Sequence, residues 1–316
     1  MAGFLTHYLH GQGVLAQLPH EITSIVKGNR ERIFNLGAQG PDIFFYYAPG
    51  FLWARTKNIG SEIHRTKFNQ FFLQMARLLK NIKNREQQEI LFAYLAGLLT
   101  HYSMDTHAHP FVNAFTLGAE NALNTNGSKT TNLQKTADHR HYETALDVLM
   151  LLRLTGQKPA AYRQWELIQA PSKHKQIAAA AFSAAATKIY ERDIMPRDVY
   201  YAMGHMAQLT RLLHSPKGRR KSFTAFLEDA TIKARILSSM VHMQEVNDGR
   251  DYLNLSRDFW EGKNASFPEI FDYATEEAAE FINALYRYMH SEMLRNELAT
   301  KLGNRSLSTG EDLAEV

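Results

Sequence analysis

Cysteine is absent from this sequence of 316 residues. Its absence excludes disulfide bonds, thiolate metal sites and cysteine nucleophiles at once. Histidine, aspartate and glutamate are then the only strong ligands that the chain offers to a transition metal, and it has 14 histidines. Any metal site must therefore use nitrogen and oxygen ligands.

Other features are also lacking. No apolar run is long enough to span a membrane, and the N-terminal stretch MAGFLTHYLHGQG has no basic segment followed by an uninterrupted apolar run. We therefore expect a cytoplasmic protein. The net charge of +4 is compatible with anionic substrates but too small to indicate nucleic-acid binding by itself. An adjacent His-Asp pair, which HD-type phosphohydrolases need, does not occur.

Helical periodicity dominates what is present. Apolar residues recur at i, i+3 and i+4 through eight segments, and no segment alternates as a strand does. These segments are 66–83, 87–109, 140–154, 160–168, 174–190, 197–214, 222–245 and 269–300. The pattern predicts an all-α protein of about eight to ten helices. We expect residues 1–302 to form one helical domain and the polar residues 303–316 to form a disordered tail.

Two segments interrupt the helices. Residues 34–60 combine glycine, proline and many aromatic residues, which predicts a loop-rich, partly buried excursion. Residues 123–137 form a polar connection between two histidine-bearing segments, where a mobile rim would lie.

A basic cluster occurs in the stretch SPKGRRKSF. It consists of Lys217, Arg219, Arg220 and Lys221. Such a loop could contact phosphate or an anionic membrane surface, and a solvated surface loop is the alternative.

The stretch LLTHYSMDTHAHPF, residues 98–111, places histidines at the end of an apolar helix that Pro110 should stop. At 100° per residue, His101, Asp105 and His109 lie at about 0°, 40° and 80° and share one face. Two imidazoles and a carboxylate are costly to bury unless they are paired, and a metal ion is a common compensation. A hydrogen-bonded His–Asp pair is the alternative.

A second cluster lies in DHRHYETALDVLMLL. His139 and Glu143 share a helix face, Asp147 lies one turn further along it, and His141 points away. Two helices that present histidine and carboxylate toward a shared interior are typical of multinuclear metal sites in helical bundles.

Three earlier residues are weaker candidates when taken singly. Asp42 follows Gly-Pro among aromatic residues and could be only a helix cap. His64, in NIGSEIHR, and His7, in LTHYLHG, could each be structural.

Taken together, these residues resemble the zinc-dependent phospholipase C family, which is related more distantly to the S1/P1 nucleases. The resemblance rests on the order His7, Asp42, His64, His101-x-x-x-Asp105-x-x-x-His109 and His139-x-x-x-Glu143. The stretches FNLGAQGPDIFFYY, NIGSEIH, HYSMDTHAHPF and HYETALDVL are similar to segments of that family, as is DYLNLSRDFWEGKNASFPEIFDYATEEA to its C-terminal part. The likeness covers most of residues 1–300.

The resemblance implies a compact all-helical hydrolase of the phospholipase C / P1 nuclease type with two or three zinc ions. One zinc would be held by Asp42, His64, His101 and Asp105, and a second by His109, His139 and Glu143. Asp105 would bridge to a third, which takes His7 and the amino-terminal group. Secreted members provide that group from a tryptophan, whereas this chain begins Met-Ala, so Ala2 or His10 would have to contribute.

The expected activity is hydrolysis of a phospholipid or another phosphodiester by metal-activated water, with Asp42 orienting or deprotonating the water. The aromatic residues after Asp42 either line an apolar cleft or belong to the core. They are Phe44, Phe45, Tyr46, Tyr47 and Trp53. Two alternatives remain open: a nuclease or nucleotide phosphodiesterase of S1/P1 type, and a non-catalytic helical binding protein with a residual zinc site.

Overall fold

The computed structural model of the chain describes residues 3–47, 56–124, 132–217, 219–231, 236–239, 241, 245–254 and 265–314. Within these ranges every regular element is a helix, and the only β pairing is a single bridge between Arg305 and Asp312. The all-α class predicted from the sequence is confirmed. The number of α-helices described, 14, exceeds the eight to ten expected.

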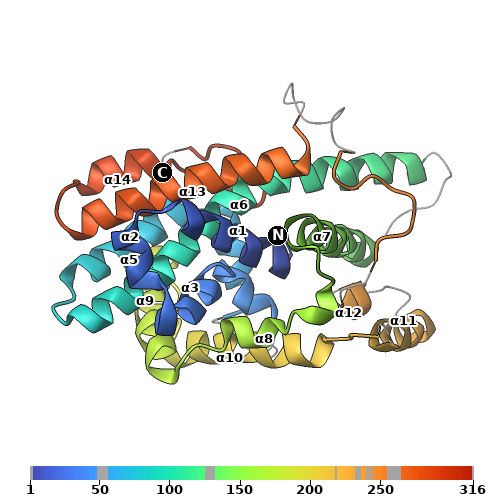
Figure 1. The fold of residues 1–316 in the computed structure, drawn as a ribbon, viewed down its shortest axis with the longest axis horizontal. Coiled ribbons are helices and arrows are strands. Elements are labelled where there is room, and N and C mark those ends of the chain that lie inside the picture. Colours follow the sequence, from blue (N-terminus) through green and yellow to red (C-terminus); the bar gives the residue numbers. More distant parts are fainter. Residues whose placement is uncertain are drawn as a thin grey trace.

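The helices form two outer layers with a packed interior between them. The α-helices are α1 (Phe4–Gln17), α2 (His20–Val26), α3 (Glu31–Gly37), α4 (Ile59–Arg65), α5 (Phe68–Asn81), α6 (Arg85–Asn124), α7 (Asn132–Thr155), α8 (Gln164–Ile168), α9 (Ser172–Tyr190), α10 (Pro196–Leu213), α11 (Arg219–Thr231), α12 (Ile236–Ser239), α13 (Phe267–Met289) and α14 (Arg295–Leu302). Short 3-10 helices are η1 (Gly28–Arg30), η2 (Gly40–Phe45) and η4 (Pro159–Ala161). In Figure 1, α13 and α14 lie along one side of the molecule, and α8, α9 and α10 lie along the opposite side.

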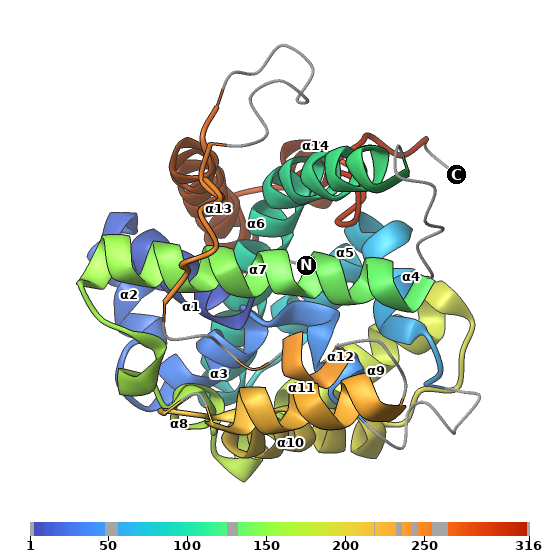
Figure 2. The ribbon, with the colours of Figure 1, turned by 90° about the vertical axis from the view of Figure 1, so that its right-hand side faces the viewer.

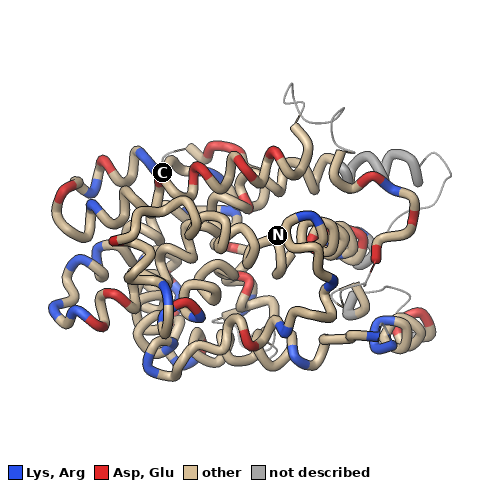
Figure 3. Tube along the Cα trace, in the orientation of Figure 1, with Lys and Arg blue, Asp and Glu red and all other residues tan. Residues whose placement is uncertain are grey.

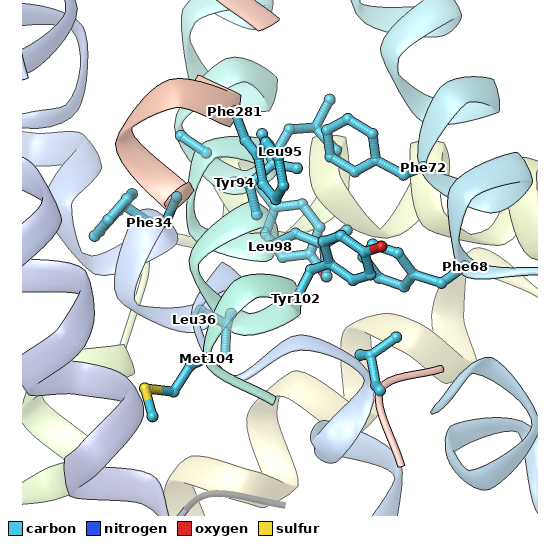
Figure 4. Packing of buried hydrophobic residues seen from close by; sticks show 14 of the residues in the cluster. Phe34, Leu36, Phe68, Phe72, Tyr94, Leu95, Leu98, Tyr102, Met104 and Phe281 are labelled. Atoms are coloured by element: carbon cyan, nitrogen blue, oxygen red, sulfur yellow. The ribbon is translucent and has the colours of Figure 1, made fainter. Parts of the chain in front are cut away.

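Helix α6 is the centre of the fold. It packs against α13, α3, α9 and α1. Its residues Leu95, Leu98 and Tyr102 lie among aromatic side chains of the core (Figure 4). The ring of Tyr102 stacks on that of Phe68, with centroids 4.5 Å apart and an interplanar angle of 6°. A helix buried on most faces can carry polar groups deep into the molecule, provided that something compensates their burial.

Helix α6 continues through Pro110 to Asn124, so the prediction that Pro110 stops it is wrong. A proline inside a helix leaves the carbonyl four residues earlier, here that of Thr106, without its helical N–H. Gly310 of the chain's C-terminal end packs on this carbonyl, with a φ of +71°, and a Cβ there would lie 2.3 Å from the oxygen. Tertiary packing therefore covers the point at which the helix is weakened.

Other helix boundaries also differ from the predictions. The segment predicted as one helix over 222–245 contains two described helices, because α11 ends at Thr231 and α12 begins at Ile236. The segment predicted over 269–300 is also two helices, α13 and α14, and Ser291 between them has a positive φ of 65°. The four helices before residue 66 were not predicted, because α1 is buried on most faces and α2, α3 and α4 have only seven residues each.

The two predicted interruptions are more helical than expected. Residues 34–60 include the end of α3, η2 and the start of α4, and residues 48–55 lie outside the described ranges. In the polar connection 123–137, α7 already begins at Asn132, and 125–131 lie outside the described residues.

The C-terminal residues 303–314 are packed, which differs from the disordered tail expected for them. Leu307 is fully buried, the amide of Ser308 donates to the carbonyl of His64, and Arg305 pairs with Glu277 of α13 at 2.7 Å. Polar composition misled the prediction because these side chains and amides find partners on α4, α6 and α13. We call residues 303–314 the C-terminal strap.

None of the helices within the described ranges is long and apolar enough to cross a membrane.

Candidate metal centre

Asp105 lies at the centre of a buried cluster of histidines. Its Oδ1 is 3.3 Å from Nε2 of His7, and its Oδ2 is 3.3 Å from Nε2 of His64 and 3.2 Å from Nε2 of His101. All four residues are at most 3% exposed. Despite these short distances, none of the three Nε2 atoms is oriented to make a hydrogen bond. Nitrogens and oxygens that face one another in this way are arranged to share a cation.

The eight residues predicted as ligands come together from five elements. They form three groups in which the possible ligand atoms lie within 4.8 Å of one another: His7, His101 and Asp105; Asp42, His64 and His101; and His109, His139 and Glu143. Helix α1 carries His7, η2 carries Asp42 and α4 carries His64, while the other five residues lie on α6 and α7. His10 is fully buried but belongs to none of the three groups.

Backbone carbonyl groups set the tautomer of three of these histidines. Nδ1 of His64 is 2.7 Å from the carbonyl oxygen of Gly60, and Nδ1 of His101 is 3.2 Å from that of Ala38. Nδ1 of His109 contacts the carbonyl oxygen of Leu307 in the C-terminal strap. A carbonyl can only accept, so each Nδ1 must donate, and each Nε2 keeps its lone pair for a metal.

Gly40 lets η2 approach the cluster. Its φ is +51°, and a Cβ at this position would lie 2.3 Å from Cδ2 of His101. Pro41 follows at the start of η2 and fixes the backbone just before Asp42, whose Oδ1 lies 3.1 Å from Nε2 of His64. The Gly-Pro pair thus brings a carboxylate against two imidazoles.

The electrostatics of the cluster suit a cation. Burial lowers the pKa of His101 and lowers that of His109 to about 3, so both imidazoles are neutral, as ligands must be. Burial acts against the charge of His64 as well, but the carboxylates of Asp105 and Asp42 raise its pKa to about 9. Burial would raise the pKa of Asp105, yet the neighbouring histidines hold it well below its ordinary value.

Comparison with protein families agrees with this arrangement. The family model described as zinc dependent phospholipase C matches residues 6–193, which include all eight predicted ligands. The chain belongs to the zinc-dependent phospholipase C family. Comparison with curated proteins and with solved structures gave no match. Family membership and the buried His/Asp/Glu groups together indicate zinc binding.

Helices α6 and α7 together carry the group His109, His139 and Glu143. Nε2 of His139 is 2.9 Å from Oε1 of Glu143, and the ring of His139 stacks on that of His109, with centroids 6.0 Å apart. His141 points away toward Tyr252, 3.2 Å from its hydroxyl group, as the helical geometry predicts. On α6, His107 likewise points away, to Glu277.

Asp147 of α7 links this helix, which carries His139 and Glu143, to α1, which carries His7. Its oxygens accept hydrogen bonds from the backbone amides of Leu5 and Thr6 at 2.9 and 2.7 Å, so the first turn of α1 is fixed to α7 beside His7. A carboxylate at a helix N-terminus also complements the helix dipole. Sequence periodicity placed Asp147 on the ligand face but assigned it no role.

An open cleft of 670 Å³ reaches four of the proposed ligands, namely His64, His109, His139 and Glu143. Three cations line it, Arg65, Lys135 and Arg140, and Glu143 is the only carboxylate among the described residues that do so. A cleft with this balance of charge favours an anionic ligand.

A smaller cavity of 70 Å³ reaches Asp42 and Glu143 and shares Phe45 and Arg140 with the open cleft. Of the aromatic residues predicted to line a cleft, Phe45 and Tyr46 do line this cavity. Phe44 and Tyr47 are core residues, 7% and 2% exposed, and Trp53 lies outside the described residues.

Proposed function

We propose that this protein is a zinc-dependent phosphoric diester hydrolase of phospholipase C type. The proposal rests on one observation. Three buried His/carboxylate groups lie in one region, around Asp105 and around Glu143, and four of their members line a cleft that also carries three cations. Family membership supports a zinc-dependent phospholipase, which is a hydrolase.

The proposed ligands form three groups, two of which share Asp105. Asp42, His64, His101 and Asp105 would hold a first zinc. His109, His139 and Glu143 would hold a second. His7, together with Asp105, would hold a third. When bound, zinc would act as a Lewis acid that lowers the pKa of a water molecule toward ~7 and offsets charge on the phosphoryl oxygens.

The chain's own residues would do the rest. The carboxylate of Asp42 orients the attacking water and accepts its proton, which a carboxylate in hydrogen-bond reach can do. Arg65, Lys135 and Arg140 attract the negative phosphodiester into the cleft. Phe45 and Tyr46 provide an apolar wall on the side of the smaller cavity, where an acyl or glyceryl group can pack. No serine or lysine nucleophile is required.

Metal counting and a substrate panel test this proposal. The full-length protein, purified without chelator, should contain two or three zinc ions, and His101→Ala and His139→Ala should each lose zinc and activity. His141→Ala is the matched control, because it removes a histidine from α7 that faces away from the centre. Circular dichroism checks the fold of each variant.

The panel contains a phosphatidylcholine, a water-soluble nitrophenyl phosphodiester and single-stranded DNA. Cleavage of the lipid with release of diacylglycerol supports the phospholipase C type. Preferential cleavage of DNA would replace it with the S1/P1 type of activity. Bound zinc with no cleavage of any member would leave a helical binding protein with a structural zinc site.

A further inference from the structure

Helix α11 has its amphipathic pattern reversed. Phe223, Phe226 and Leu227 are 64%, 69% and 45% exposed, and they lie on one face together with Arg219. The acidic residue Glu228 points inward instead, where it is 5% exposed and accepts a hydrogen bond from the amide of Ser238 at 2.9 Å. A helix in a water-soluble fold normally buries its apolar stripe. Here the polar contact is buried and the apolar stripe faces outward.

Fixed contacts hold α11 in this orientation. The ammonium group of Lys221 donates to the carbonyl oxygens of Ser238 and Val241 at 2.9 and 2.7 Å. The guanidinium group of Arg220 donates to those of Leu212 and His214 at 2.6 and 3.1 Å. These two cations of the basic cluster therefore have structural partners. Among the described residues, no hydrogen-bond or ion-pair partner is found for Lys217 or Arg219, which are both exposed.

The helix stands at the edge of the molecule but is tied to the metal centre. Figures 1 and 2 show α11 beside α12, below α7, and Figure 3 marks lysine and arginine on this outlying helix. Thr144, which follows Glu143, donates to the carbonyl oxygen of Ser239 in α12 at 3.0 Å. Ser215, which lines the cavity next to the centre, accepts the amide of Arg220 at 3.0 Å. Anything bound by α11 is thus brought near the cavity that contains Asp42 and Glu143.

We propose that the exposed face of α11 docks on the surface of an anionic phospholipid bilayer. The choice of a lipid partner rests on the proposed function, and the face itself has the chemistry for it. Phenylalanine and leucine side chains can enter the boundary between head groups and acyl chains, while Lys217 and Arg219 meet the negative head groups.

Vesicle sedimentation tests the docking. The probes are vesicles of phosphatidylcholine with and without phosphatidylserine, and the protein is the full chain. Binding by the double variant Phe223→Ser/Phe226→Ser should fall at least about tenfold, because two large apolar side chains no longer leave water. The matched control is Tyr273→Ser/Leu294→Ser, which removes two residues away from α11, one in α13 and one at the N-cap of α14, that are 59% and 63% exposed. It should bind as the wild type does.

Charge variants separate the two contributions. Lys217→Gln and Arg219→Gln should each weaken binding about fivefold to vesicles that contain phosphatidylserine, and should leave binding to phosphatidylcholine alone unchanged. Hydrolysis of a water-soluble phosphodiester should be unchanged in all these variants, because none of the substituted residues touches the metal centre.

Three results would overturn the proposal. They are wild-type protein that binds neither kind of vesicle, a double serine variant that binds like the wild type, and a wild-type dimer that the double variant dissociates in analytical ultracentrifugation. The last would make the face an interface between two copies of this chain. Binding is measured apart from turnover, so a protein that docks through α11 but cleaves no diester would refute the proposed function and leave the docking intact.

Discussion

Charged residues are usually exposed and large apolar residues are usually buried. Helices α6 and α11 each break one half of this rule. Helix α6 buries His101, Asp105 and His109, whereas α11 exposes Phe223 and Phe226. Burial of charge and exposure of large apolar groups both cost free energy, so each helix favours a partner that offsets this cost. We propose a cation for the first helix and an apolar, anionic surface for the second. The two regions should therefore respond independently to substitution.

The largest effect is expected from Asp105→Asn. Asparagine keeps the shape but removes the charge that faces His7, His64 and His101. Bound zinc should fall by at least one ion per chain, and hydrolysis of a soluble phosphodiester should fall by about 10³-fold. Elemental analysis and initial rates measure both.

The control for Asp105→Asn is His107→Gln on the same helix, since His107 points to Glu277 and should not affect the zinc content. Vesicle binding should be unchanged in Asp105→Asn. If it were lost with the zinc, α6 and α11 would be coupled, and the comparison between them would fail.

Gly40→Ala should have a smaller effect on the same centre. A methyl group there would lie 2.3 Å from the ring of His101 and must displace it. We expect zinc affinity to fall about 10–100-fold, as when the support of a ligand is lost. Gly28→Ala is the matched control, because Gly28 has a φ of +80° and no atom lies within 4 Å of its added Cβ. Zinc affinity is measured by competition with a chelator. If Gly40→Ala and Gly28→Ala lost the same amount of zinc affinity, backbone strain, and not the contact with His101, would be responsible.

The contrast between α6 and α11 also shows which features a sequence can reveal. The spacing of His101, Asp105 and His109 fixed their common face because helical phase is a local property. The C-terminal strap was not predictable, since its contacts with His109 and His64 join residues that are 198 and 244 positions apart (307 − 109 and 308 − 64) and leave no local pattern. Helix α11 shows a third limit. Periodicity reveals an apolar stripe, but not whether that stripe faces the core or the solvent.

Glu277 should make the C-terminal strap sensitive to acid. Burial would raise the pKa of Glu277, but the hydrogen bond from His107 and the guanidinium of Arg305 lower it to about 2. Because the pKa is lowered in the folded state, the stabilisation is complete above pH ~4.5 and is lost as pH falls toward 2. At pH 7, Glu277→Gln should lower the free energy of unfolding by about 2 kcal/mol, and this difference should vanish toward pH 2.

Denaturant unfolding of the wild type and of Glu277→Gln at several pH values measures the difference. Glu280→Gln serves as control, because Glu280 lies one turn away and its side chain is 62% exposed. A difference that stays constant with pH would mean that packing, not the charge of Glu277, supports the strap.

The smallest effect is expected from Lys221→Met, which tests whether the outward face of α11 depends on its anchoring. The ammonium group of Lys221 donates to the carbonyl oxygens of Ser238 and Val241, and loss of these bonds should cost about 1–2 kcal/mol locally. Hydrogen exchange of the α11 amides should become faster and vesicle binding a few-fold weaker, with or without phosphatidylserine, while zinc content stays the same. Lys217→Met should leave exchange unchanged and weaken binding only to anionic vesicles. If Lys221→Met behaved like Lys217→Met, Lys221 would act as a lipid-binding cation, and the reversed orientation of α11 would have to be set by Glu228 and Arg220 instead.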